Sequence, residues 1–460
     1  MGATIELPIW FFGLIVVFAA VTFASHFLFP SVRWFFRGRA EKVVSRLNER
    51  LERPIEPFKL ARRYDTIQRL IYDPEVAQAV VEHAAENGLR EDVAFEEARR
   101  YAQEIVPSFS ATAYFKLGTR GAKWLSRGLY RVRLGHFDEA LSEVSPDATV
   151  VFVMNHRSNM DYVLVTYLAA QRSALSYAVG EWARVWPLSR LIRSMGAYFI
   201  RRRSRSALYR KVLARYVQMA TAGGVTQAIF PEGGLSLDGR TAAPKLGLLN
   251  YVLAGAEVSE KDVVFVPVAL NYDRVLEDRI LMAAGERGER RFRAKMSVVA
   301  GFILRQFWLR ITGRFYRFGY AAVSFGSPVS LAALGETTTE EVAEKLMDRI
   351  REVVPVVPIP LVALAVLNGA RTRSDIELFA KDLLDKVPEA HVHLPRDSVA
   401  YAVEVGLRGL ELRDALVQGD MIEIKDEALV NFYAASIEHF WEPNVVPPEP
   451  AKKQAETSAA

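Results

Sequence analysis

From residue 149 onward, short runs of β-forming residues alternate with longer segments, and this alternation constrains the fold more than any other feature. The longer segments can hold crossover helices, which are the usual connection between parallel strands. We therefore predict an α/β fold, with a mixed, mostly parallel sheet flanked by helices. The predicted strands are 149–154, 174–179, 197–200, 226–230, 263–270 and 322–325.

An almost unbroken apolar run, Leu7 to Phe29, predicts a transmembrane helix at the N-terminus. A helix needs ~20 such residues to cross a bilayer, and His26 is the only readily ionised side chain in the run. A basic cluster follows, so the positive-inside rule places the rest of the chain in the cytoplasm. We expect a single-pass protein of the cell (inner) membrane; the alternative is a buried core helix. The cluster comprises Arg33, Arg37, Arg39, Lys42 and Arg46.

Changes of pattern along the chain predict five regions. A capping box of Thr338 and Glu341 marks the start of a helix in the fourth of them. The regions are 1–39, a transmembrane anchor with a basic flank; 40–115, helical; 116–335, an α/β catalytic domain; 336–443, helical; and 444–460, a disordered tail rich in Pro, Ala, Lys and Glu.

Composition excludes several kinds of chemistry. The 460 residues contain no cysteine, which excludes disulfides, thiolate metal sites and a cysteine nucleophile. Lys and Arg total 59 against 54 Asp and Glu, an excess too small to indicate a nucleic-acid partner. His391 and His393 are a close histidine pair without nearby companions, so we predict no metal site.

The most informative motif, Asn155-His-Arg-Ser-Asn-Met-Asp161, directly follows the predicted strand 149–154. The carboxyl end of a strand is where α/β folds place ligands. Asp161 falls in the first turn of the next predicted helix, where its carboxylate can accept the N–H of the His156 imidazole and keep the other ring nitrogen basic. Such a pair suits deprotonation of an alcohol. Spacing alone is weak evidence, and a structural histidine is the alternative.

A second motif, residues 196–203, ends in the arginines Arg201, Arg202 and Arg203 after another predicted strand. Guanidinium groups offer forked donors that suit a phosphate. The alternatives are a solvated basic face or contact with anionic lipid.

A third motif, residues 230–240, is rich in glycine, which allows the backbone to approach a substrate closely. Glu232 can bind a polyol or anchor the loop, and Arg240 and Lys245 can meet an anion. The spacing around Ser236 is wrong for a nucleophile elbow.

A fourth motif, residues 266–274, includes Pro267 within an apolar strand. Proline lacks the N–H of a ladder hydrogen bond, so it predicts an edge strand or a bulge. Tyr272 and Arg274 are expected near the end of this strand.

These four motifs, in this order, resemble the glycerophospholipid acyltransferase family, and most closely its glycerol-3-phosphate and dihydroxyacetone-phosphate acyltransferase branch. The Tyr-Asp-Arg ending of the fourth favours this branch over lysophosphatidate acyltransferases. A weaker likeness extends to residues 432–439. The four family motifs correspond to 156–161, to 196–202, to Glu232-Gly233 with Ser236 and Gly239, and to Pro267 with 272–274.

The resemblance implies transfer of a fatty acyl group from acyl-CoA or acyl carrier protein to the sn-1 hydroxyl of glycerol 3-phosphate, which gives lysophosphatidate for phospholipid synthesis. It makes His156 the general base and Asp161 the residue that orients it. No cofactor is expected, because the thioester is already activated, and the bilayer is the other partner. The implied substrate-binding residues are Arg157, Ser158, Gly196, Phe199, Arg201, Arg202, Glu232, Gly233, Ser236, Gly239, Arg240, Lys245, Pro267, Tyr272 and Arg274.

One departure from the family pattern concerns the phosphate. The branch commonly has arginines at the positions of Leu235 and Leu237, and leucine cannot bind phosphate. Either Arg240, Lys245 and 201–203 replace them, or the acceptor differs. The alternatives are a dihydroxyacetone-phosphate or lysophosphatidate acyltransferase, or a catalytically silent membrane scaffold that binds lipid on the same fold.

Overall fold

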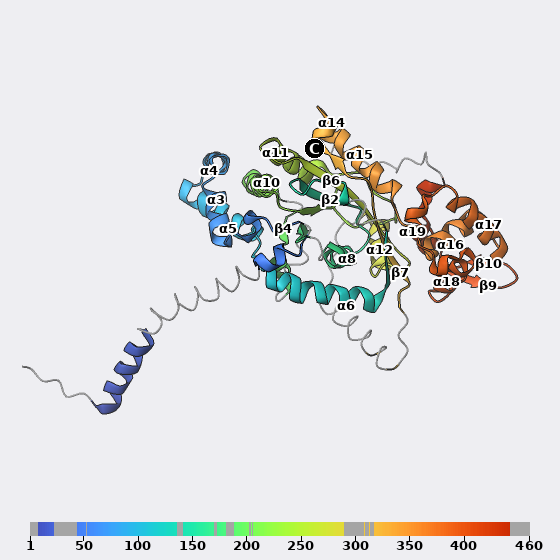
Figure 1. Ribbon diagram of the computed structural model, residues 1–460, viewed down its shortest axis with the longest axis horizontal. Coiled ribbons are helices and arrows are strands. Elements are labelled where there is room, and N and C mark those ends of the chain that lie inside the picture. Colours follow the sequence, from blue (N-terminus) through green and yellow to red (C-terminus); the bar gives the residue numbers. More distant parts are fainter. Residues whose placement is uncertain are drawn as a thin grey trace, which may run out of the picture. The chain divides into compact units, whose positions relative to one another are not determined.

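The computed structural model divides the chain into two compact units, Met1–Ile55 and Glu56–Ala460 (Figure 1). The residues that it describes are 8–22, 44–51, 53–135, 141–169, 173–180, 188–201, 204, 206–288, 308, 312 and 317–441.

In the first unit, residues 9–22 form a helix with exposed apolar side chains, among them Ile9, Trp10 and Phe18. Within the described residues, no helix combines the length and the apolar character needed to cross a bilayer. Residues 7 and 23–29 of the predicted transmembrane run lie outside the described part, as does most of the basic cluster. The membrane anchor therefore stays a prediction.

The described part of the second unit contains an eight-stranded sheet with the order β1-β7-β6-β2-β5-β3-β4, in which β8 also pairs with β6. Five strand pairs are parallel, while β7 and β8 run antiparallel to β6. The predicted mixed, mostly parallel sheet is confirmed. The strands are β1 (Arg131–Gly135), β2 (Thr149–Met154), β3 (Ser176–Gly180), β4 (Tyr198–Ile200), β5 (Gln227–Ile229), β6 (Val263–Tyr272), β7 (Tyr320–Phe325) and β8 (Val329–Ser330), with a separate hairpin of β9 (Leu416–Gln418) and β10 (Ile422–Ile424).

Of the two alternatives predicted at Pro267, an edge strand or a bulge, the edge strand is wrong, because β6 lies inside the sheet. On one side, Pro267 pairs with Val153 of β2. On the other side, the pairing with β7 begins at Val268, and Gly326 beyond the end of β7 donates to the Pro267 carbonyl (2.9 Å). The proline thus sits at the break between β7 and β8, where its missing N–H leaves no ladder bond unmade.

Helices cover the sheet, and helices from the N-terminal and C-terminal parts of the second unit extend beyond it (Figure 1). The predicted capping box of Thr338 and Glu341 is confirmed at the start of α15. The described helices of the second unit are α2 (Pro57–Leu60), α3 (Arg63–Ile71), α4 (Pro74–Asn87), α5 (Glu91–Ile105), the π-helical η1 (Ala113–Gly118), α6 (Thr119–Leu129), α8 (Met160–Ala169), α9 (Leu188–Ser194), α10 (Ala207–Ala222), α11 (Leu246–Glu257), α12 (Asp278–Glu286), α14 (Leu331–Leu334), α15 (Thr339–Glu352), α16 (Pro358–Leu367), α17 (Arg373–Leu384), the short η3 (Glu389–His391) and η4 (Pro395–Asp397), α18 (Val399–Glu411), α19 (Glu427–Ala434) and the short η5 (Glu438–Phe440).

Charged contacts fasten the N-terminal helices to the sheet region. Arg215 of α10 binds both carboxylate oxygens of Asp73 (3.0 and 2.6 Å). Asp73 also accepts the Glu75 N–H (3.1 Å) and so caps α4. Both carboxylate oxygens of Glu104 on α5 bind Arg201 (2.9 and 2.6 Å).

The parallel strands β2 and β6 end at the same edge of the sheet, and the loops that follow them meet there. The side-chain amide of Asn155 donates to the carbonyl of Leu270 (3.0 Å) and accepts its N–H (2.8 Å). This pair of bonds fixes the start of the β2–α8 loop, residues 155–159, against β6.

Asp273, directly after β6, joins the sheet to the C-terminal helices. Its two carboxylate oxygens accept the N–H groups of Ile359 in α16 (2.8 Å) and Tyr320 in β7 (2.7 Å). The carboxyl group is fully buried, and this burial raises its pKa from 3.8 to about 7.

We predict that Asp273→Asn flattens the pH dependence of stability. The folded protein holds the Asp273 proton more tightly than the unfolded chain, so the free energy of unfolding should fall as pH rises from about 4 toward 7. The variant lacks this titration. At pH 5 it should also be less stable by about 1–3 kcal/mol, because an amide has one acceptor oxygen for two N–H groups.

Denaturant unfolding in detergent between pH 5 and 8 measures both effects. Other buried carboxyl groups keep part of the slope, so a shallower curve is expected rather than a flat one. Equal slopes in the variant and the wild type would contradict the assignment.

Candidate active site

The carboxylate of Asp161, in the first turn of α8, is the centre of the polar cluster at the end of β2. Oδ2 receives hydrogen bonds from the His156 ring Nδ1 (2.9 Å) and from the backbone N–H groups of Arg157 (2.7 Å) and Ser158 (3.0 Å). Oδ1 accepts the hydroxyl of Tyr272 (2.5 Å). Asp161 is fully buried. Burial and the Asp161 charge raise the pKa of Tyr272 well above its usual value, so its hydroxyl keeps the proton that it donates.

The His156 imidazole is held in one orientation. With its Nδ1–H donated to Asp161, the ring carries its lone pair on Nε2. The Phe230 ring lies 4.2 Å from the imidazole, centroid to centroid, at 30°, and the Tyr162 ring lies 5.3 Å away, edge on. The side chain is only 2% exposed. An imidazole oriented by a carboxylate in a largely dry site can take a proton from a hydroxyl group.

The β5–α11 loop, residues 230–245, forms hydrogen bonds with the backbone N–H and carbonyl groups of His156. One oxygen of Glu232 accepts the His156 N–H (2.9 Å), and the other accepts the N–H of Ala242 (3.0 Å). The N–H of Ser236 donates to the His156 carbonyl (2.9 Å). Burial raises the pKa of Glu232 to about 7. Both oxygens are thus committed to backbone groups, so Glu232 anchors the loop.

The far end of the same loop makes a tight turn against α19. The Ser236 hydroxyl accepts the N–H of Gly239 (3.0 Å) and donates to the carbonyl of Arg240 (2.7 Å). Gly239 has a φ of +92°, and a β-carbon there would collide with the carbonyl of Phe432. Only glycine fits this position.

Arg157 carries a buried guanidinium beside this turn. Its Nη1 donates to the Gly239 carbonyl, and the group lies 5.4 Å from the centroid of the Phe432 ring. The side chain is 3% exposed, and its Nε and Nη2 have no hydrogen-bond partner among the described residues. Burial lowers the pKa of the guanidinium. Buried donors without partners are costly, and they suit an anionic ligand.

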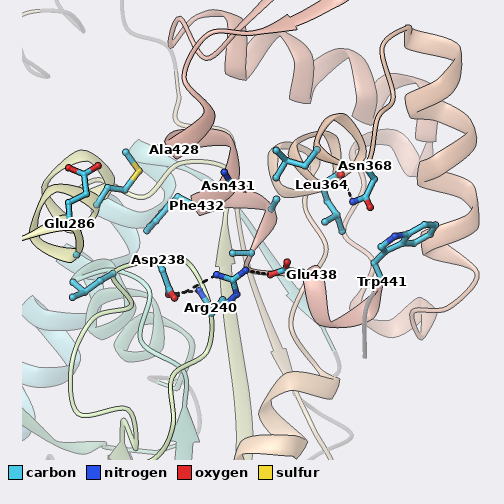
Figure 2. Close-up of a pocket in the computed structure, with 16 residues that line it drawn as sticks. Asp238, Arg240, Glu286, Leu364, Asn368, Ala428, Asn431, Phe432, Glu438 and Trp441 are labelled. Carbon is cyan, nitrogen blue, oxygen red and sulfur yellow. Dashed lines mark hydrogen bonds and ion pairs between the residues drawn. The ribbon is translucent and has the colours of Figure 1, made fainter. Parts of the chain in front are cut away.

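A cavity of about 480 Å³ lies next to this turn, between the β5–α11 loop, α12, α16 and α19 (Figure 2). Arg240 extends into it, and its Nη2 binds Glu438 (2.6 Å) while its Nη1 lies 3.9 Å from Asp238. The Nε of Arg240 is buried, with no partner in the described part of the chain. Phe432 lines the cavity and also contacts the guanidinium of Arg157, so it connects the cavity with the loop of His156.

Several residues of this site were not expected from the sequence. Glu277 accepts the Ser158 hydroxyl (2.8 Å) and the side-chain amide of Asn159 (2.9 Å), and so supports the β2–α8 loop from outside. Phe432 and Glu438 come from the C-terminal helical region. The weak likeness over residues 432–439 was the one sequence signal for that region.

Other predicted binding residues are engaged elsewhere. Arg201 binds Glu104 with both carboxylate oxygens, and Arg202 lies outside the described residues. Arg274 stacks on Phe318, 4.5 Å from the ring centroid.

The remaining predicted residues have structural settings. Phe199 is buried in β4 and Pro267 lies within β6. Gly196 has a φ of +90° and packs against Phe109. The side chain of Lys245 lies against Gly233, whose φ is +64°. In the described part of the chain, no group of three His, Asp or Glu side chains is arranged to hold a metal ion.

Residues 136–271 match the protein family described as Acyltransferase. The predicted acyltransferase family is therefore confirmed for this part of the chain, which holds the β2–α8 and β5–α11 loops.

The chain is also similar to longer proteins named glycerol-3-phosphate acyltransferase. Those from Pseudomonas fluorescens (strain Pf0-1) and Ectopseudomonas mendocina (strain ymp) are each 28% identical to it, over 419 and 422 residues. The alignments cover 83% of this chain and 49% of each relative, so the chain spans about half the length of the curated relatives it matches. A solved structure, the 1-acyl-sn-glycerophosphate (LPA) acyltransferase of Thermotoga maritima, superimposes with a TM-score of 0.32 and 18% identity, over 56% of this chain and 80% of that chain.

We predict that Glu232→Gln loosens the β5–α11 loop. An amide has one acceptor oxygen, so either the His156 or the Ala242 N–H would lose its partner, at a cost of about 1–3 kcal/mol. Amide hydrogen exchange should accelerate in residues 231–245. Glu286→Gln is the matched control, because Glu286 is exposed at the edge of the cavity. Unchanged exchange in Glu232→Gln would refute the anchoring role.

Proposed function

We propose that this protein transfers a fatty acyl group from an acyl thioester to the sn-1 hydroxyl of glycerol 3-phosphate, giving lysophosphatidate. The observation that carries the proposal is the His156–Asp161 pair, held by four hydrogen bonds to one buried carboxylate, beside a buried guanidinium with unused donors. The names of the similar proteins support this choice of acceptor.

In the proposed mechanism, Nε2 of His156 takes the proton of the acceptor hydroxyl as its oxygen attacks the thioester carbonyl. Asp161 stabilises the imidazolium that forms, and Tyr272 holds the carboxylate in place. The carbon–sulfur bond then breaks, and the thiolate leaves with the proton from the imidazolium. The donor is acyl-CoA or acyl carrier protein.

Arg157 and Arg240 are the proposed phosphate ligands. Arg157 donates to the carbonyl of Gly239, Arg240 follows Gly239 in the chain, and both have buried nitrogens without partners among the described residues. Leu235 and Leu237, which stand where relatives of this branch have arginines, pack against the hydrophobic core instead, and Leu237 lines the cavity. The two guanidinium groups supply the charge that these leucines lack.

The compartment is part of the proposal. We place the α/β region on the cytoplasmic face of the inner membrane, with residues 7–29 as a single transmembrane anchor. The apolar run and the basic cluster after it support this placement.

We predict that His156→Ala lowers the rate of acyl transfer by about 10²–10⁴-fold, because a general base contributes that much. The assay offers glycerol 3-phosphate, dihydroxyacetone phosphate and lysophosphatidate separately, with acyl-CoA and with acyl carrier protein as donors. Transfer to glycerol 3-phosphate by the wild type alone would support the proposal.

Three outcomes would count against it. Wild-type rates in a folded His156→Ala variant would show that His156 is not the general base. Transfer to another acceptor only would keep the mechanism and change the substrate. Binding of lipid without transfer to any acceptor would favour a silent scaffold.

We predict opposite effects from the two partners of the ion pair in the cavity. Arg240→Gln should raise the KM for glycerol 3-phosphate about tenfold or more, because it removes a charge-assisted hydrogen bond. Glu438→Gln should lower this KM, because its carboxylate competes with the phosphate for the same guanidinium. Glu286→Gln is again the control. A raised KM in Glu438→Gln would instead show that Glu438 positions Arg240 for binding.

A further inference from the structure

The helices η1 and α6 and the strand β1 form a surface of one charge. No Asp or Glu occurs between residues 105 and 135. Six basic residues in this segment are exposed, and we call them the basic face. They are Lys116, Arg120, Lys123, Arg127, Arg131 and Arg133.

The basic face also exposes large apolar side chains. Leu117 is 67% exposed and Trp124 is 70% exposed. Each directly follows a lysine of the basic face, since Leu117 comes after Lys116 and Trp124 after Lys123. The opposite side of α6, with Ala122, Ser126 and Leu129, is buried, and α6 packs against α8. The apolar side chains of the basic face are therefore not part of the core.

The basic face differs from the other charged surfaces of the second unit. Exposed basic residues in the C-terminal helices are commonly paired with nearby carboxylates, as in Arg349–Glu352 and Lys386–Asp382. No ion pair joins the six residues of the basic face to an acidic side chain in the described part of the chain. Among the described residues, no carboxylate neutralises these six charges.

A second cavity, of about 430 Å³, opens beside this face between α6, β1 and α8. Its walls include the guanidinium-bearing residues Arg127, Arg131 and Arg317, together with Tyr130 and Tyr167. Arg127 lies 5.7 Å from the centre of the Tyr167 ring. Three arginines around one cavity provide forked donors for a phosphate group.

We propose that the basic face lies on an anionic phospholipid bilayer, with a lipid phosphate headgroup in the cavity of Arg127, Arg131 and Arg317. The positive charge of the basic face matches the negative surface of such a membrane. The exposed Trp124 favours a lipid surface over an acidic protein, because tryptophan prefers the interface between water and hydrocarbon. This contact does not depend on the proposed reaction or on residues 7–29.

The contact would place the candidate active site near the membrane surface. The helix α6 packs on α8, and α8 carries Asp161 in its first turn. A product with an acyl chain would be released beside α8, with α6 between that helix and the bilayer.

Spin labelling of the protein tests this contact. The chain has no cysteine, so a single introduced cysteine carries the only label. Gly121 lies within the basic face, and a side chain there enters open space. The label at Gly121→Cys is compared with one at Gly419→Cys, in the exposed β9–β10 turn. Each protein is reconstituted into vesicles of phosphatidylcholine alone or with phosphatidylglycerol.

We expect collisions of a water-soluble nickel relaxant with the label at Gly121→Cys to fall at least threefold when phosphatidylglycerol is present, and those at Gly419→Cys to stay unchanged. Reversing Lys116, Arg120 and Lys123 to Glu should abolish the difference. Reversing Lys345, Arg408 and Lys425, three exposed basic residues elsewhere, changes the net charge equally and should leave it intact.

Two results would overturn the proposal. The label at Gly121→Cys would stay equally accessible in both vesicles, or protection would persist after the charge reversal on α6. Protection of Gly121→Cys only by an added acidic protein would assign the face to a protein partner instead. Acyl transfer is not part of the readout, so failure here leaves the proposed function untouched.

Discussion

The carboxylate of Asp161 is the interaction on which the rest of the site depends. Four donors converge on it, and they come from two separate parts of the chain: the imidazole and two backbone N–H groups of the β2–α8 loop, and the hydroxyl at the end of β6. A fully buried carboxylate is expensive unless its lone pairs are used. Here the hydrogen bonds that offset this cost also fix the orientation of His156. The same interactions therefore stabilise the buried carboxylate and position the imidazole.

Further hydrogen bonds hold the β2–α8 loop in place around this carboxylate. Glu232 and Ser236 fasten the backbone of His156 from one side, and Glu277 fastens the loop from the other. The turn at Gly239 then brings the guanidinium of Arg157 against the ring of Phe432, which belongs to the C-terminal helices. The C-terminal region is therefore a wall of the cavity, and the cavity exists only when that region is folded against the β5–α11 loop.

The sequence predicted the parts that depend on local pattern. The alternation of strands and helices indicated the α/β class and six of the strands, and His156 and Asp161 followed from their place after β2. It could not predict the contacts made across the fold. Of the edge strand and the bulge predicted at Pro267, the edge strand was wrong, because no local pattern marks the break between β7 and β8. Arg201 was predicted to bind substrate, and its ion pair with Glu104, which lies 97 residues away in the chain, was not expected. The strand β1 was not predicted from the sequence, because it is short and carries exposed arginines.

The hydrogen bonds of the site also span long stretches of sequence, since Glu232 is 76 residues from His156 and Tyr272 is 111 residues from Asp161. Contacts of such separation close large loops and form late in folding. During synthesis, the β2–α8 loop would leave the ribosome long before the groups that complete it. The nascent chain thus passes through a stage in which β2 and the β2–α8 loop exist before Glu232 and Tyr272, so the hydrogen bonds from these two residues form only after β5 and β6 have been made.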